Sequence, residues 1–146
     1  ERASPLKTTS GNIAGKAVAI EYGAPSVKGR VIWGDLVPYG EVWRTGANEA
    51  TNVTFEKDVK VEGETVKEGR YSLFTIPRED EPWTIILNSD WDLEHGHFQY
   101  NEENDVLRVD VSPTFGTDHQ EMLSIEVVNE GIEIKWEKAK VLVNIE

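Results

Sequence analysis

Short runs rich in β-forming residues, with apolar and polar positions in alternation, recur along the whole chain and constrain its fold more than any other feature. Residues 70–76, for example, are strong β formers and end at Pro77, where a strand should stop. A period of two places successive side chains on opposite faces, so each run predicts a half-buried strand. The predicted strands cover residues 18–22, 31–33, 52–57, 59–61, 70–76, 83–87, 106–111, 122–128, 132–136 and 141–145.

The number and spacing of these runs define the expected fold class. About nine or ten strands in 146 residues predict an all-β fold, an antiparallel β-sandwich. Gly63 and the stretch 129–131 carry turn signals that permit tight reversals between neighbouring strands. One long irregular loop, residues 36–50, interrupts the pattern. Because the chain has the length of one domain and contains no repeat or linker, residues 1–146 are expected to form a single all-β domain.

Composition excludes several classes of partner. The chain has 27 acidic and 15 basic residues, a net charge of −12, and its basic residues are scattered, so nucleic acid is not an expected partner. No apolar run approaches the ~18 to 20 residues that span a bilayer, so membrane insertion is not expected either. Cysteine is absent, which excludes disulfides and thiolate chemistry.

The irregular loop and the residue that follows it carry the richest chemistry. They contain a guanidinium, an amide, a carboxylate and a hydroxyl beside two aromatic rings, a set that can bind a carboxylate, a phosphate or a sugar. The predicted ligand-binding residues are Tyr39, Trp43, Arg44, Asn48, Glu49 and Thr51. The alternative is that the loop is a core plug, with its aromatic residues buried and Arg44 paired with Glu41 or Glu49.

A second, acidic loop contains a possible metal site. His95 and His97 lie two residues apart, so in an extended segment both imidazoles point to one side, where Asp92 or Glu94 can complete a divalent site. The alternative is a solvated loop with ordinary histidines. An EF-hand is excluded because Leu93 stands where the calcium loop requires glycine. No cofactor is expected, since phosphate-binding glycine loops and dinucleotide fingerprints are absent.

Longer segments of the chain resemble a known family. Residues 27–40 and 42–51 resemble the bacterial family catalogued as domain of unknown function 2911, and residues 68–77, 83–88 and 105–109 fit the same pattern. The resemblance extends from Ser4-Pro5 to the last predicted strand. Two departures are Trp33 and Glu41, at positions where the family has Phe and Lys.

The resemblance implies an identity but no activity, because that family has no established substrate or catalytic residues. Its members look like exported proteins of Bacteroidetes-type bacteria, which implies a periplasmic or secreted location with a leader removed. The chain begins without Met, in agreement with that expectation.

Three functional hypotheses follow. The first is a binding or accessory module of the cell envelope for a glycan or a small anionic ligand. The second is a purely structural or interaction domain. The third is a metal- or carboxylate-dependent hydrolase with Glu49 as base, which is least favoured because only His119 lies outside the acidic loop and no nucleophile elbow is present. The oligomeric state is left open.

Overall fold

The computed structural model describes residues 3–93 and 99–146, and within these the chain forms ten strands and no helix longer than one turn. No helix in this part of the chain is long and apolar enough to cross a membrane. The strands are β1 (Leu6–Ile13), β2 (Lys16–Gly23), β3 (Thr51–Phe55), β4 (Val59–Val61), β5 (Glu64–Val66), β6 (Gly69–Ile76), β7 (Trp83–Asn88), β8 (Asp105–Val111), β9 (Thr114–Val128) and β10 (Gly131–Asn144). The all-β prediction is confirmed.

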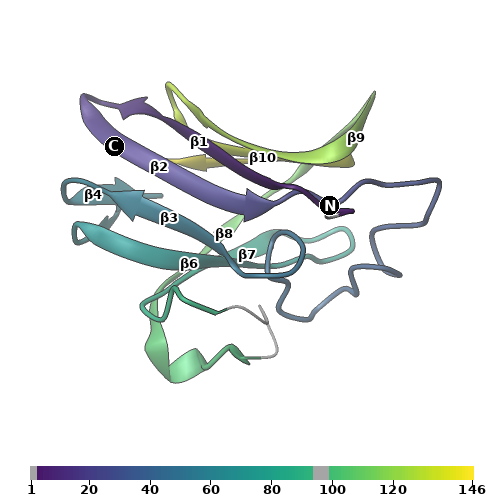
Figure 1. Cartoon of the computed structure of the whole chain (residues 1–146), viewed down its shortest axis with the longest axis horizontal. Helices are drawn as coiled ribbons and strands as arrows, with labels where there is room; N and C mark the ends of the chain where they lie inside the picture. Colours follow the sequence, from purple (N-terminus) through teal and green to yellow (C-terminus); the bar gives the residue numbers. More distant parts are fainter. Residues whose placement is uncertain (1–2, 94–98) are drawn as a thin grey trace.

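The first layer is a six-stranded antiparallel sheet in the order β1-β2-β3-β6-β7-β8 (Figure 1). In this sheet, β1–β2 and β6–β7 are joined by short connections, whereas a long irregular segment leads from β2 to β3 and the β4–β5 hairpin separates β3 from β6. That hairpin reverses at Glu62 and Gly63, which both have positive φ angles, as the sequence predicted for this glycine.

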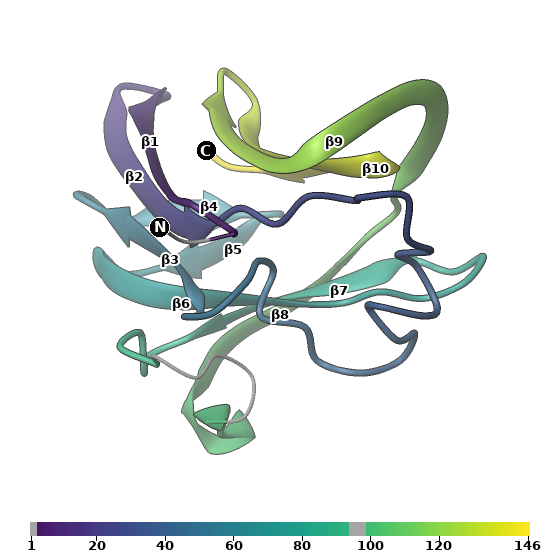
Figure 2. The ribbon, with the colours of Figure 1, turned by 45° about the vertical axis from the view of Figure 1, so that its right-hand side comes forward.

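The second layer is built on the β9–β10 hairpin, which lies over the six-stranded sheet (Figure 2). A bridge between Val61 and Ile145 links β4 to the end of β10, with Lys60 N donating to Glu146 O at 2.8 Å. The register of β9 and β10 shifts on both sides of Glu137, whose φ is 59°. A bulge of this kind bends a strand, and the end of the chain returns to the hairpin turn, where Ile145 N donates to Glu130 O at 2.9 Å.

The main core lies between the two layers. On β2, Val18, Ile20 and Tyr22 point inward, and the residues between them point outward, as the period-two pattern predicted. The second layer contributes inward residues such as Leu123 and Ile125, both almost fully buried. The two layers therefore pack face to face as a sandwich.

A smaller core lies on the outer face of the six-stranded sheet. It consists of Ala50, Phe74, Ile76, Ile86 and Leu93, with Tyr100 packed against it. The carboxylate of Asp105 anchors Tyr100 there, because it accepts hydrogen bonds from Asn88 Nδ2 at 2.9 Å, Tyr100 OH at 2.6 Å and Arg108 Nε at 2.8 Å.

The loop predicted at residues 36–50 is part of a longer irregular segment, residues 24–50, which we call the crossover. Its first residues lie beside β9, where Val27 N donates to Glu121 O at 2.9 Å. Its later residues lie beside β6, where Trp43 N donates to Thr75 O at 2.8 Å. The crossover thus passes from the second layer to the first at one end of the sandwich (Figure 2).

Several details of the strand prediction are wrong. β5 was not predicted, and the two strands predicted at residues 132–136 and 141–145 are parts of the single strand β10. Residues 31–33 form turns rather than a strand, because Lys28, Gly29 and Gly34 have positive φ angles that break an extended chain. β1 was not predicted, since most of its side chains are exposed and only Ile13 is buried, so it shows no apolar alternation.

Candidate functional site

A cluster of four tryptophans lies where the crossover closes the sandwich. Trp33 and Trp43 come from the crossover, Trp83 from β7 and Trp136 from β10. The ring of Trp33 lies 4.8 Å from that of Trp83, and the rings of Trp43 and Trp136 are stacked at 5.9 Å with an interplanar angle of 13°. Such ring pairs stabilise a fold by about 0.5–1.5 kcal/mol each beyond the area they bury.

Hydrogen bonds orient three of these indoles. Trp33 Nε1 donates to Glu137 Oε1 at 3.1 Å, and Trp136 Nε1 donates to the carbonyl oxygen of Glu121 at 3.2 Å. Trp83 Nε1 donates to the carbonyl oxygen of Arg78 at 3.0 Å. The bulge at Glu137 therefore has a second role, because it presents the carboxylate that holds the crossover against β10.

An open hollow of about 300 Å³ lies against this cluster, and we call it the crossover hollow. Trp43, which is 7% exposed, and Trp136 contribute to its wall. The other lining residues are Ser4, Pro25, Arg30, Leu36, Val37, Arg44, Gly46, Ala47 and Asn48. Its wall therefore combines two indoles and aliphatic side chains with two guanidinium groups.

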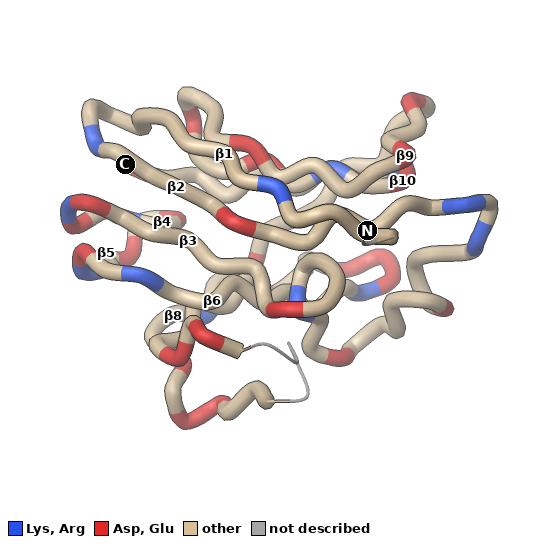
Figure 3. Tube along the Cα trace, in the orientation of Figure 1, with Lys and Arg blue, Asp and Glu red and all other residues tan. Residues whose placement is uncertain are grey.

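The charge of this hollow differs from that of the whole chain. Acidic positions are spread round the molecule (Figure 3), which has a net charge of −12, yet none of the described residues that line the hollow is acidic. Arg44 donates to the carbonyl oxygen of Asn48 at 2.6 Å, which orders the loop around it. Burial lowers the pKa of the Arg44 guanidinium, but an arginine still carries its charge at neutral pH. The hollow is thus a local positive site on an acidic protein.

Three of the six predicted ligand-binding residues come together here, namely Trp43, Arg44 and Asn48. Whether they bind a ligand stays a prediction. The ring of Trp43 is buried in the tryptophan cluster, as the core-plug alternative expects, whereas Arg44 and Asn48 line an open hollow.

The other three predicted residues lie outside the lining. Thr51 is fully buried, and its hydroxyl donates to the carbonyl oxygen of Thr45 at 2.8 Å. Tyr39 packs against Gly34, where a Cβ atom would lie only 2.6 Å from the tyrosine ring. Burial raises the pKa of Tyr39, and the nearby acidic residues raise it further. Glu49 is half-buried and does not line the hollow.

Arg30 and Trp136 line the hollow but were not among the predicted site residues. Arg30 Nε donates to the carbonyl oxygen of Val27 at 3.0 Å, and this bond holds the guanidinium against the backbone of the crossover. The sequence signal that could have identified Arg30 was its position in residues 27–40, the segment that resembles the family. No local signal marks Trp136, because it joins the site through the packing of β10 on the crossover.

The predicted metal ligands His95 and His97 lie outside the described residues. Among residues 3–93 and 99–146, no three His, Asp or Glu side chains come together as a metal site.

Comparison with known proteins addresses identity. Residues 4–145 match the model of a family described as "Protein of unknown function (DUF2911)". Comparisons with curated proteins and with solved structures returned no match. Since the family model covers nearly the full chain, this protein belongs to the DUF2911 family.

Proposed function

We propose that this protein is a binding module whose crossover hollow takes a small organic anion with a flat apolar body. The observation that carries the proposal is the pairing of Arg30 and Arg44 with the indoles of Trp43 and Trp136 around one open hollow. Ligand sites combine an apolar wall with a few polar groups that fix orientation. A guanidinium beside such a wall selects a carboxylate or a phosphate.

The size and electrostatics of the hollow support a small ligand. A volume of about 300 Å³ lies at the lower end of the range for ligand pockets, which is about 300–1,000 Å³. The partial burial of Arg44 strengthens its attraction for an anion, because charges interact more strongly where water is partly excluded. The ligand would gain dispersion contacts from Trp43 and a charge-assisted hydrogen bond from an arginine.

Binding is favoured over hydrolysis at this hollow. A carboxylate-dependent hydrolase needs an acid or a base within hydrogen-bond reach of its substrate, and the described lining contains neither a carboxylate nor an imidazole. A structural role for part of the loop is the second candidate, supported by the burial of Trp43 and Thr51. The two roles are compatible, because the buried residues hold the lining residues in place.

Tryptophan fluorescence provides the test, since Trp43 lies in the hollow. The protein is titrated with phenylacetate and phenylpropionate, and separately with their primary amides, which have the same shape without the charge. We expect the carboxylates to bind at least about tenfold more tightly, because a hydrogen bond to a charged group contributes about 1.5–3 kcal/mol. Equal affinity for acid and amide, or binding of neither, would contradict the proposal.

Charge-removing variants locate the binding. Arg44→Gln and Arg30→Gln should each weaken carboxylate binding about tenfold. Lys28→Gln is the matched control. Lys28 lies in the exposed turn next to Arg30 and does not line the hollow, so the substitution removes one positive charge nearby. We expect that control to change the affinity by less than about twofold. Equal losses in all three variants would mean that only net charge matters.

The proposal also places the protein in the periplasm or outside the cell. Its support is the resemblance to a family whose members look like exported proteins. Fractionation of the source bacterium, followed by immunoblotting, tests this. Detection in the periplasmic or secreted fraction agrees with it, and detection in the cytoplasmic fraction alone contradicts it.

A further inference from the structure

A second hollow lies on the outer face of the six-stranded sheet. It has a volume of about 360 Å³ and is formed by β1, β2, β3 and the start of β6. We call it the sheet groove. The described residues that line it do not overlap with those of the crossover hollow.

The strand register places polar side chains across this groove in two rows. Ser10, Ala19, Thr54 and Arg70 are direct partners on four adjacent strands. Glu21 and Asn52 are partners in the next outward-facing row. Four strands at a spacing of ~4.8 Å give the first row a length of about 14 Å, which suits an elongated ligand. Small side chains at the β1 end of the row, Ser10 and Ala19, leave the space that forms the groove.

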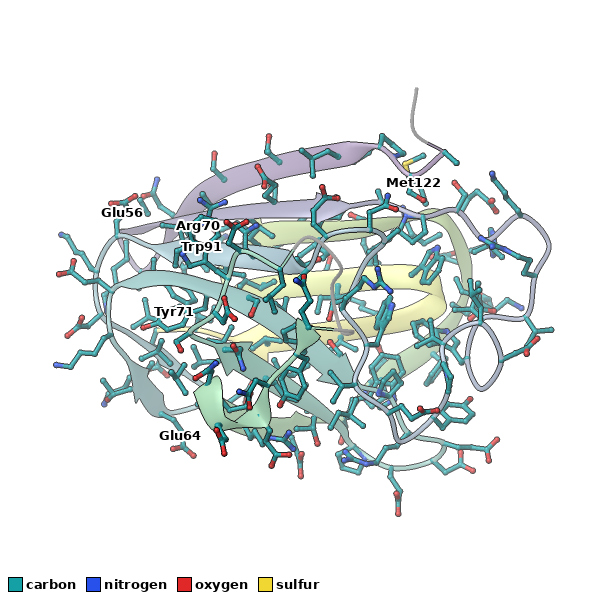
Figure 4. All side chains as sticks on the ribbon, turned by 60° about the horizontal axis from the view of Figure 1, so that its bottom comes forward. Glu56, Glu64, Arg70, Tyr71, Trp91 and Met122 are labelled. Atoms are coloured by element: carbon teal, nitrogen blue, oxygen red, sulfur yellow. The ribbon has the colours of Figure 1, made fainter. Side chains whose placement is uncertain are left out.

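Arg70 is held in one orientation at the β6 end of the groove. Its Nε donates to Asn52 Oδ1 at 3.0 Å, and its Nη2 lies 3.8 Å from Glu21 Oε1. Its guanidinium carbon lies 3.7 Å from the centre of the Trp91 ring, and Figure 4 shows the two side chains together at the sheet surface. Asn52 is only 6% exposed, although it belongs to the outward row. The groove therefore contains polar groups that are fixed before any ligand arrives.

We propose that the sheet groove binds a neutral oligosaccharide. Sugar hydroxyls both donate and accept hydrogen bonds, and the groove offers both kinds of partner, namely a guanidinium, a carboxylate, an amide and hydroxyls. The charges of Arg70 and Glu21 offset each other, so the groove has no preference for an ion. The ring of Trp91 packs on the Arg70 guanidinium and so holds this donor in place at the β6 end of the groove.

The oligosaccharide has more support than a peptide strand. A peptide that adds to a sheet pairs with the backbone of an edge strand. The sheet groove instead lies across the faces of four strands, and most of the residues that line it, all except Thr9 and Ile20, direct their side chains outward. The ligand can therefore make most of its hydrogen bonds with side chains, as a carbohydrate does.

A filling variant tests the proposal without removing a native contact. Ala19→Trp places a large side chain at the centre of the groove, on a residue that is exposed in the native protein. Ala17→Trp is the matched control, because Ala17 is exposed on the same outward face of β2 and does not line the groove. If Ala19→Trp does not fold, Ser10→Tyr fills the same row from the edge strand β1.

The probes are immobilised neutral gluco-, xylo-, manno- and galacto-oligosaccharides, followed by calorimetric titration with whichever is retained. We expect at least one to bind the native protein and Ala17→Trp with equal affinity, and to bind Ala19→Trp at least tenfold more weakly. Trp91→Ala should weaken the same binding. Retention of none, retention of acidic sugars only, or equal binding by Ala19→Trp would overturn the proposal.

Discussion

The crossover hollow and the sheet groove are similar in size, about 300 and about 360 Å³, but they are built in different ways. The crossover hollow lies on an irregular segment whose two tryptophans, Trp33 and Trp43, pack in the core. The sheet groove lies on regular strands, and most of its lining side chains point away from the core. We therefore expect substitutions in the crossover hollow to affect both folding and binding. Substitutions in the sheet groove should affect binding with little effect on folding.

The two sites also differ in charge. The crossover hollow contains two guanidinium groups and no described acidic residue, whereas the sheet groove pairs Arg70 with Glu21. Although the chain has a net charge of −12, none of the described residues that line the crossover hollow is acidic. Four measurements test this contrast, and their expected effects decrease from the stability of the fold to the response to salt.

The largest expected effect is on stability. Trp43→Ala removes a nearly buried ring that contacts both Trp33 and Trp136, so the free energy of unfolding should fall by about 3–5 kcal/mol. Trp91→Ala, on the sheet side, should lower it by no more than about 1 kcal/mol, because that ring is only half-buried and stacks on the Arg70 side chain at the surface. Urea denaturation measures both. Similar losses in the two variants would remove the distinction between the sites.

Two threonines of β3 provide a smaller, matched pair. Thr51→Val removes a buried hydroxyl and leaves the carbonyl oxygen of Thr45 without that donor, which should cost about 1–3 kcal/mol. Thr54→Val changes a half-buried threonine that lines the sheet groove and should cost less than about 0.5 kcal/mol. Thermal unfolding of the two variants compares them directly. A larger loss for Thr54→Val would show that the groove side also supports the fold.

A pH effect is expected on the sheet side. Burial, followed by the hydrogen bond to Asp105, raises the pKa of Tyr100 to about 12 from an ordinary value of 10.0. The folded chain therefore keeps a proton that the unfolded chain loses, so this contribution to stability is complete below pH 10 and disappears between pH 10 and about 12. Urea denaturation across this range should show the decline.

Tyr100→Phe is the control for that pH effect, because it keeps the ring that packs 4.8 Å from Phe74 and removes the titrating hydroxyl. The variant should lose less stability than the native protein over the same pH range. Phenolate absorbance provides a second readout, since one tyrosine should ionise only near pH 12. Identical pH profiles for the variant and the native protein would contradict the assignment.

The smallest expected effect is the response to salt. Raising the ionic strength from about 0.05 to about 0.5 M should weaken carboxylate binding in the crossover hollow several-fold, because counterions screen Arg30 and Arg44. Binding of a neutral oligosaccharide in the sheet groove should change by less than about twofold. Parallel titrations at the two salt concentrations provide the comparison. Equal salt dependence would contradict the difference in ligand charge.

Sequence patterns predicted much of the sandwich, but only three of the six predicted ligand-binding residues line the crossover hollow. The prediction selected Trp43, Arg44 and Asn48 because their side chains offer suitable chemistry within one loop, and these three residues do line a common hollow. It selected Thr51 for the same reason, although that hydroxyl points inward and satisfies a backbone carbonyl. Residue type shows what a side chain can bind, but its direction depends on the path of the backbone.

The sheet groove was not predicted at all. Arg70, Glu21 and Asn52 occupy the outward positions of three strands that are distant in sequence, and each looks like an ordinary surface residue when its strand is considered alone. They meet only because β2, β3 and β6 are neighbours in the sheet. Knowledge of strand order was therefore necessary to identify this site.

Local alternation, turn residues and motif order were sufficient to predict the all-β class, most strand positions, the turn at Gly63 and the family. Three features depend on tertiary packing and could not be predicted from local sequence. Residues 24–50 cross between the layers, Trp136 packs in the tryptophan cluster, and Arg70 lies beside Glu21. The physical reason is that the chain's own periodicity specifies which face of a strand is buried. Which strands become neighbours depends on how the buried faces of the whole chain pack together.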